Sequence, residues 1–376
     1  SDVYKRQLYN GNKIQEKKLE IGIILSKYKN EVTMVTIKDV AQKAGVNPST
    51  VSRVLKDNRS ISQKTKEKVR KAMADLGYVP NVAAQMLASG LTHNIGLVFP
   101  PIMTSDRLSE PFFMEILSTI TSEAKNHHFT VSIATGMSLD DLLEQVKLMH
   151  LQKRVDGFII LYSVQEDPVR KYLMSNKIPF VIVGAPEGDA NKITYIDNDN
   201  QLMAKTAVDH LYQKGHRQIL FITDDLVSEV ASERYIGYLK GCLKLSLETQ
   251  PMLLFDRKDP VSVESLMENI RAFKATALVV IGDVLSVRMV QLLSFYNIKV
   301  PDDMSIITFN NSSYAKLIHP YLTTFDINVA NLGKTSFKQL LDIINSKEQS
   351  LSQKIFVPFT LKKRESVRDI NPSSTN

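Results

Sequence analysis

The sequence predicts a small all-α head followed by an α/β body built from two doubly wound, mainly parallel sheets. Three observations predict this class. Apolar residues recur with a helical period between residues 36 and 76. From residue 95 onward, short continuous apolar runs alternate with amphipathic segments, which is the pattern of buried parallel strands connected by helices. This alternation occurs in two successive series, so we expect two such sheets.

Residues 36–56, TIKDVAQKAGVNPSTVSRVLK, predict two short helices joined by a tight turn. From Thr36 to Ala44 the apolar residues occupy one helical face, at i, i+3, i+4 and i+7. Gly45 ends the first helix because it lacks a side chain and tolerates left-handed backbone. Asn47 offers an N-cap oxygen, and Pro48 fills the first helical position, where no amide donor is needed.

The second helix carries a polar and basic face. Its apolar residues Val51, Val54 and Leu55 share the opposite face, so we expect the following side chains to point outward: Ser49, Thr50, Ser52 and Arg53. Such a face suits insertion into the major groove of DNA by a helix-turn-helix. An ordinary helical hairpin with a solvated face has the same spacing, so the pattern alone leaves both interpretations open.

The charge distribution favours the DNA-binding interpretation. The chain has 376 residues and a formal net charge of +7. Between Met34 and His93, ten Lys and Arg residues accompany four acids, a net of +6. Residues 1–33 add +3 (seven basic, four acidic), which leaves −2 for residues 94–376. A basic head on a slightly acidic body is typical of a DNA-binding domain attached to a second module.

A third helix and a hinge are expected after this pair. Residues 62–76 predict a helix capped near Ser62 and closed by Gly77. Residues 81–93 predict a short hinge helix and a polar linker. A helix of about eight residues is too short to be stable alone in water. We therefore do not expect this helix to be stable on its own.

The body is expected to alternate strands and helices twice. The first series predicts strands at 95–99, 129–134, 155–161 and 180–183, with helices at 111–127, 139–151 and 168–176. The second predicts helices at 199–213, 232–245, 261–273 and 284–296, with strands at 218–223, 252–255, 277–281 and 305–309. Ligands of open α/β sheets bind at the carboxyl ends of the strands, so the residues that follow these strands are ligand candidates.

Composition excludes several classes of protein. Cys242 is the only cysteine, so no intramolecular disulfide forms, a reducing cytoplasm is compatible, and we expect a small buried residue there. The apolar run 19–25 is far shorter than the roughly 20 residues of a membrane span. The seven histidines lack metal-ligand spacing, and no phosphate loop, nucleophile elbow or dinucleotide fingerprint occurs. We expect no metal, no cofactor and no enzyme activity.

The sequence of residues 36–55 resembles the signature of the lactose-repressor/galactose-repressor (LacI/GalR) family of bacterial transcription regulators. The likeness continues by pattern from Met34 to about Val367. It implies a helix-turn-helix DNA-binding domain at 34–80, a hinge helix and linker at 81–93, and a body like that of periplasmic binding proteins. Its N-subdomain would be 94–184 plus 328–346, and its C-subdomain 185–327 plus 347–370. Residues 1–33 fit no part of this fold, so we expect a disordered or artefactual extension.

The resemblance also implies the residues that contact each ligand. The implied DNA-binding residues are Thr36, Pro48, Ser49, Thr50, Ser52, Arg53, Asn58, Asn81, Ala84 and Leu87. The implied effector-binding residues are Phe112, Phe113, Tyr162, Arg234, Asp283 and Asn310. In the family, the leucine at the position of Leu87 wedges into the operator from the minor groove and kinks the duplex. Of the two phenylalanines we expect one to stack on a sugar and one to pack in the core. Asn310 departs from the aspartate of many relatives.

The resemblance implies a homodimeric, cytoplasmic and nucleoid-associated repressor of carbohydrate-utilisation genes. Its partners would be double-stranded operator DNA and a small sugar effector, with no membrane involved. The blocks at 111–113, 153–157, 165–168 and 197–200 resemble those of maltose-operon repressors of Gram-positive bacteria, which favours maltose or a maltodextrin. Two alternatives remain open. One is a global catabolite regulator with a phosphocarrier-protein corepressor. The other is a sugar-binding transport receptor, which would need an export signal and no basic head.

Overall fold

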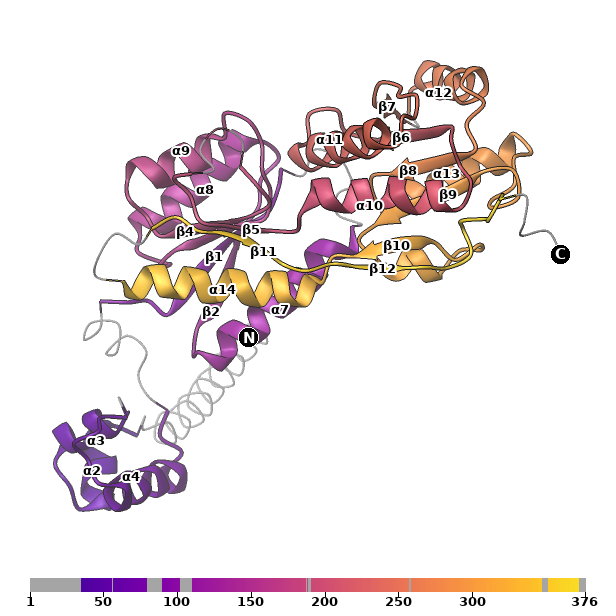
Figure 1. The fold of residues 1–376 in the computed structure, drawn as a ribbon. Coiled ribbons are helices and arrows are strands. Elements are labelled where there is room, and N and C mark those ends of the chain that lie inside the picture. Colours follow the sequence, from indigo (N-terminus) through magenta and orange to yellow (C-terminus); the bar gives the residue numbers. More distant parts are fainter. Residues whose placement is uncertain are drawn as a thin grey trace, which may run out of the picture. The chain divides into compact units, whose positions relative to one another are not determined.

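The computed structural model describes residues 35–55, 57–79, 90–101, 110–186, 188, 191–256, 258–346 and 351–371. They belong to two compact units, Ser1–Gly90 and Leu91–Asn376 (Figure 1). The extension expected at 1–33 and the hinge residues Asn81, Ala84 and Leu87 lie outside the described residues. Among the described residues, no helix has the length and apolar character needed to cross a bilayer.

The head contains three helices, α2 (Ile37–Ala44), α3 (Pro48–Leu55) and α4 (Gln63–Leu76). Their bounds match the predicted ones to within one residue. Gly45 and Gly77 close α2 and α4 with φ of 59° and 62°, in the left-handed region that favours glycine. A small core holds the helices together. Its fully buried centre has one valine from each helix: Val40, Val51 and Val69.

The first sheet of the body has the strand order β11-β5-β4-β3-β1-β2, and all its pairs are parallel. Its strands are β1 (Asn94–Val98), β2 (Thr130–Ala134), β3 (Phe158–Ile160), β4 (Phe180–Val183), β5 (Tyr195–Asp197) and β11 (Lys354–Phe356). Helices α7 (Pro111–Asn126) and α14 (Val329–Asn345) share a core cluster on one face. Helices α8 (Leu139–Leu151) and α9 (Pro168–Ser175) cover the other face.

The second sheet has the order β12-β10-β9-β8-β6-β7 and is parallel except for the β10–β12 pair. Its strands are β6 (Ile219–Thr223), β7 (Leu253–Leu254), β8 (Ala277–Val280), β9 (Ser305–Phe309), β10 (Thr323–Asp326) and β12 (Thr360–Lys362). Helices α10 (Asn200–Gln213) and α11 (Glu229–Lys244) pack on one face. Helices α12 (Pro260–Ala272) and α13 (Asp283–Phe295) pack on the other. The predicted α/β class with two doubly wound sheets is confirmed (Figure 1).

The sheets divide the chain differently from the subdomain bounds expected from the sequence. Residues 185–327 and 347–370 were assigned to the C-subdomain, yet β5 and β11 pair in the first sheet. Both strands have only three residues, so neither has the long apolar run that marks a buried strand. The chain therefore crosses from the first sheet to the second after β5 and again after β11. Helix α14 packs on the first sheet, as expected.

One side-chain amide joins the three crossing segments. Asn198, which directly follows β5, is buried. Its Nδ2 donates to the carbonyl of Ile327 at 3.0 Å and to that of Val357 at 2.8 Å. Residues 327 and 357 directly follow β10 and β11, so Asn198 satisfies buried carbonyls on both returning segments. The motif at 197–200 therefore includes a structural joint between the two sheets.

Candidate functional site

Helix α3 presents the polar face that its sequence predicts. Val51 and Val54 are buried in the head core. Pro48, Ser49 and Arg53 are exposed, whereas Thr50 and Ser52 are half-buried. An eight-residue helix held by two valines thus displays a cation and short hydroxyl side chains, the groups that bind phosphates and base edges.

Two further predicted DNA contacts have structural partners in the head. The Thr36 amide and hydroxyl both donate to Asp39 Oδ2, each at 2.7 Å, and these bonds lower the pKa of the Asp39 carboxyl. Asn58 Oδ1 accepts the amide of Ser60 at 2.9 Å. Both residues remain exposed. Thr36 caps the start of α2, and Asn58 shapes the loop after α3.

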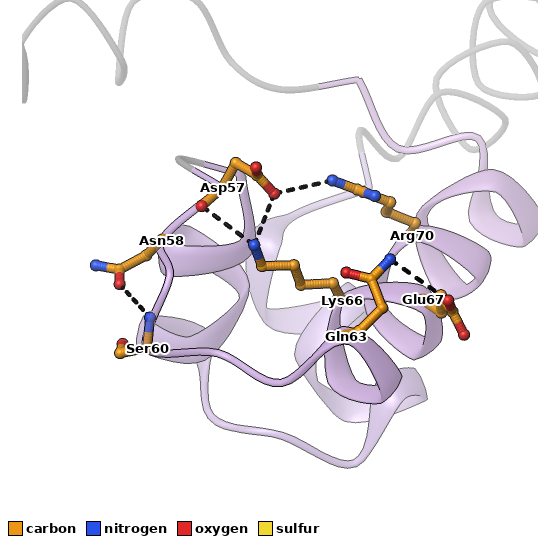
Figure 2. Close-up of polar contacts among 7 residues, drawn as sticks. All are labelled: Asp57, Asn58, Ser60, Gln63, Lys66, Glu67 and Arg70. Atoms are coloured by element: carbon orange, nitrogen blue, oxygen red, sulfur yellow. Dashed lines mark hydrogen bonds and ion pairs between the residues drawn. The ribbon is translucent and has the colours of Figure 1, made fainter.

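Asp57 holds the loop between α3 and α4, as Figure 2 shows. Its Oδ1 accepts from Lys66 Nζ at 2.9 Å and from Arg70 at 3.1 Å. Lys66 Nζ also donates to the Asp57 carbonyl at 3.1 Å. The bond and charge of Lys66, reinforced by Arg70, lower the pKa of the Asp57 carboxyl. Two of the ten cations of the head therefore stabilise a loop, whereas Arg53 projects from α3.

The body contains a pocket of about 380 Å³, including the solvent at its mouth. Its lining comes from the starts of α7, α13 and α14 and from the segment after β9, so it lies between the two sheets. The lining residues are Glu110, Pro111, Phe112, Glu115, Gly282, Asp283, Val284, Asn310, Ser312 and Val329. Gly282 and Asn310 follow the carboxyl ends of β8 and β9, where ligands of such sheets are expected.

Asp283 forms the polar floor of this pocket. It is buried, and burial raises the pKa of its carboxyl to about 6. Its Oδ2 accepts the Ser312 amide at 2.5 Å, and its Oδ1 accepts the Thr324 hydroxyl at 3.1 Å. A carboxylate has about four acceptor positions, so capacity remains for hydroxyl groups of a ligand.

Asn310 and Phe112 add a polar and an apolar wall. Asn310 lines the pocket with φ of 93°, a left-handed backbone that asparagine tolerates better than most residues. Phe112 lines the pocket, whereas Phe113 packs against Phe99, with ring centroids 5.7 Å apart. Three of the six predicted effector residues, Phe112, Asp283 and Asn310, are thus brought together.

Arg234, one of the predicted effector residues, lies outside the pocket lining. The side chain is buried within the body and is not part of the pocket lining. Its Nε donates to Asn200 Oδ1 at 2.9 Å, and its guanidinium donates to the Ile281 carbonyl at 2.6 Å. Its Cζ lies 4.2 Å from the centroid of the Phe309 ring. Arg234 therefore supports the floor from behind, linking α10 and α11 to the end of β8.

Tyr162 is likewise outside the pocket lining. Its ring is buried in the cluster that α8 and α9 form with the first sheet. Its hydroxyl donates to Asp167 Oδ1 at 3.3 Å, and burial raises the pKa of Tyr162 well above its ordinary value. Side chains alternate between the faces of a strand. Tyr162 therefore follows Ile160 onto the face away from α7, and it does not line the pocket.

Three polar residues of the pocket were absent from the prediction. Glu115 lies one helical turn after Phe112, so the i, i+3 spacing on α7 would have placed it on the same face. Ser312 is two residues after Asn310. Glu110 precedes the first turn of α7. Partial burial, and then the charge of Asp326, raise the pKa of Glu115.

Among the described residues, no cluster of side chains suited to a metal ion occurs.

A three-helix head with an exposed polar helix, joined to a two-sheet body with a pocket between its sheets, is the arrangement of DNA-binding transcription regulators. Comparison with known families agrees. Residues 36–81 match the model of bacterial regulatory proteins of the lacI family, and residues 208–367 match a periplasmic binding protein-like domain. The chain belongs to the lacI family. It is a transcription repressor of that family and not an enzyme.

Individual relatives are similar over nearly the whole chain. The HTH-type transcriptional regulator MalR of Staphylococcus xylosus is 34% identical over 340 residues, covering 90% of this chain and 99% of the relative. A lac repressor dimer bound to operator and the anti-inducer ONPF has a TM-score of 0.69 and 26% identity, covering 89% and 99%. The regulator CelR in complex with cellobiose has a TM-score of 0.67 and 25% identity, covering 88% and 99%.

Proposed function

We propose that this repressor acts as a homodimer. Its two heads bind the half-sites of a pseudo-palindromic operator, and a small sugar in the pocket of the body sets the affinity for that operator. The proposed sugar is maltose or a maltodextrin, and the controlled genes serve carbohydrate use. The observation that carries the proposal is the pairing of an exposed cationic helix α3 with a polar, phenylalanine-walled pocket in one chain.

The head supports the DNA part of this proposal. Arg53, Ser49 and Pro48 stand exposed on α3, where they would meet base edges in the major groove, with lysines of the head on phosphates. Thr36, Thr50, Ser52 and Asn58 complete the proposed contact surface. The proposed hinge is 81–93, with Asn81, Ala84 and Leu87 as DNA contacts and Leu87 entering the minor groove. The dimeric lac repressor with similar fold is bound to its operator, which supports the dimer.

The pocket supports the sugar part. A sugar presents hydroxyl groups at its rim and apolar C–H groups on its ring face. Asp283 and Asn310 provide acceptors for the hydroxyls, and Phe112 provides an aromatic wall for the ring. Maltose is supported by the similarity to MalR of Staphylococcus xylosus. The cellobiose complex of CelR supports a disaccharide in a body of this fold.

Fluorescence anisotropy with duplexes from the DNA flanking this gene tests the proposal. We expect salt-dependent binding to one duplex, and a tenfold or larger change in affinity when maltose is added, on the order of the 1–3 kcal/mol of known couplings. Binding that requires a phosphorylated carrier protein would favour the catabolite regulator instead. Binding of maltose without any affinity for DNA would favour a receptor.

A pair of phenylalanine variants provides the control. Phe112→Ala removes the pocket wall and should abolish the response to maltose while DNA binding persists. Phe295→Ala removes an exposed ring at the end of α13, outside the pocket lining, and should leave the response intact. Equal loss in both variants would contradict the assignment of the pocket.

A further inference from the structure

The charges around the pocket point to the chemical class of its ligand. We infer that the pocket selects an uncharged polyhydroxyl compound and rejects phosphorylated or carboxylated sugars. This inference rests on the proposed function, because it concerns the same pocket. It adds which form of a sugar the repressor senses.

The described lining of the pocket is acidic. Three of its ten residues are carboxylic acids, Glu110, Glu115 and Asp283, and none of the described ten is Lys, Arg or His. A fourth acid, Asp326, lies near enough to Glu115 for the two charges to interact. A phosphate that entered this space would approach several like charges in a partly desolvated environment, where repulsion is weakly screened.

Two of the three helix N-termini at the pocket, those of α7 and α13, are already complemented by the protein's own acids. A helix N-terminus is a common anion site because its first amides and its dipole attract negative charge. Helix α7 begins with Glu110 at the N-cap and Pro111 at the first position, and proline has no amide hydrogen to offer. Helix α13 begins with Asp283 itself. Neither of these two N-termini therefore presents an uncompensated positive end to a ligand. The third, that of α14, has no acid in its first turn and is capped by Asn328, whose side-chain oxygen accepts the Asn331 amide.

The cations nearest the pocket are engaged with protein acceptors. Arg234 donates to Asn200 Oδ1 and to the Ile281 carbonyl. The charges of Asp197, Asp283 and Glu110 all favour its ionised form.

Two further cations lie around the neighbouring strands. Arg364 donates to the Leu322 carbonyl at 2.8 Å and to Asn311 Oδ1 at 2.5 Å. Lys362 Nζ is 4.0 Å from Asp326 Oδ2. An anionic ligand would share each of these cations with protein acceptors that already hold it, whereas a neutral sugar needs no cation.

The same acids favour a neutral sugar. Each sugar hydroxyl is a donor, and a carboxylate accepts such a bond more strongly than a neutral group does. Asn310 adds both a donor and an acceptor. The effector must therefore be supplied by a step that leaves the sugar without a phosphate, such as uptake of the free sugar or hydrolysis of a longer neutral chain. Uptake coupled to phosphorylation would produce a compound that this pocket rejects.

Isothermal titration calorimetry of the full chain with maltose and with maltose 6′-phosphate tests the inference. We expect the phosphate ester to bind on the order of 10- to 100-fold more weakly, as like charges at this range and dielectric predict. Raising the salt concentration should reduce the ratio of the two dissociation constants, because screening weakens the repulsion between the phosphate and the acids. Glu115→Gln should narrow it at constant salt. Glu144→Gln, on the exposed side of α8, is the matched control and should leave the ratio unchanged.

The outcomes separate this inference from the proposed function. Equal or tighter binding of the phosphate ester would overturn the inference while a sugar effector would stand. A preference for maltose that neither salt nor Glu115→Gln reduces would also overturn it, because the selection would then be steric. Binding of neither compound at millimolar concentration would contradict the sugar effector, and the inference with it.

Discussion

The head and the body treat charge in opposite ways. The head keeps Arg53 exposed on a helix whose apolar face alone is buried. The body buries charge: Arg234, Asp197 and Asp283 are all enclosed, and each is hydrogen-bonded. Exposed cations attract a polyanion over a distance and do so in a salt-dependent way. Enclosed charges are fixed in position, so they discriminate between small ligands that differ by one group.

The buried charges of the body form a connected network between the crossing segments and the pocket floor. Asp197 accepts from Asn200 Nδ2 at 3.0 Å, and Asn200 Oδ1 accepts from Arg234. Arg234 then reaches the Ile281 carbonyl, two residues before Asp283. Burial raises the pKa of Asp197 to about 6 and lowers that of Arg234 to about 10. The comparison predicts that variants in this network act on stability, whereas variants of α3 act on binding alone.

The largest effect is expected for Arg234→Met. It leaves Asn200 Oδ1 and the Ile281 carbonyl without their buried donor and removes the positive charge near Asp197. Removing one member of a buried charged network costs about 3–5 kcal/mol. Chemical denaturation should show a body that unfolds at lower denaturant, with the head transition unchanged. Arg154→Met, at an exposed position of the body, is the control and should change stability little. Equal free energies of unfolding for the two variants would show that Arg234 does not stabilise the body.

A smaller effect, confined to DNA binding, is expected for Arg53→Ala. Loss of one arginine contact to a base or phosphate should weaken operator binding by about 1–3 kcal/mol without changing unfolding or maltose affinity. Lys147→Ala removes the same charge from exposed α8 in the body and should leave operator binding intact. Anisotropy titrations of both variants would make the comparison. Weaker operator binding by both variants would show that the net charge of the protein, and not a specific contact of α3, sets the affinity.

The smallest effect is a pH dependence of the body. His210 is buried. Burial, and then the charges of Lys363, Lys214 and His216, lower the pKa of His210 to about 4. The unfolded chain binds this proton near pH 6.5, so stability is lost as the pH falls from about 6.5 towards 4.

Replacing the histidine isolates that contribution. His210→Gln should remove on the order of 1–2 kcal/mol of the acid destabilisation, measured as unfolding free energy at both ends of this range. Asp197 and Asp283, whose pKa values are raised, act in the opposite direction, so only the difference between variant and parent is informative. In the head, Lys66 and Arg70 lower the pKa of the Asp57 carboxyl, so these bonds stabilise the head until the pH falls below about 4. A parallel pH profile for parent and variant would contradict this assignment.

The sequence predicted the head more completely than the pocket, and the reason is physical. The head depends on local signals, such as the glycines at 45 and 77 and the cap at Ser62, which act within one turn of their own helix. The pocket unites starts of helices that lie more than 200 residues apart, from Glu110 to Val329. Phe112, Asp283 and Asn310 were named through the family resemblance, and each also follows a strand or begins a helix at the edge where ligands of such sheets are expected.

The predictions differ from the structure where the direction of a side chain or the length of a strand determined where a residue lies. Tyr162 is at the right edge of the sheet, but its side chain points to the other face. Arg234 has the right chemistry, but it lies outside the pocket lining, where it donates to Asn200 and to the Ile281 carbonyl. Strands β5 and β11 are too short to leave an apolar pattern, so the sheet boundaries were misplaced. Positions 81–89 lie outside the described residues, so the roles of Asn81, Ala84 and Leu87 stay predictions.

The central claim is that the head and the pocket are two sites joined by one coupling free energy. Calorimetric titration of maltose into the repressor alone and into its complex with operator DNA tests it most directly. Coupling is reciprocal, so the ratio of the two maltose affinities must equal the ratio of operator affinities measured with and without maltose. The account predicts equal ratios that differ from one. Maltose affinity that is identical with and without operator would contradict it.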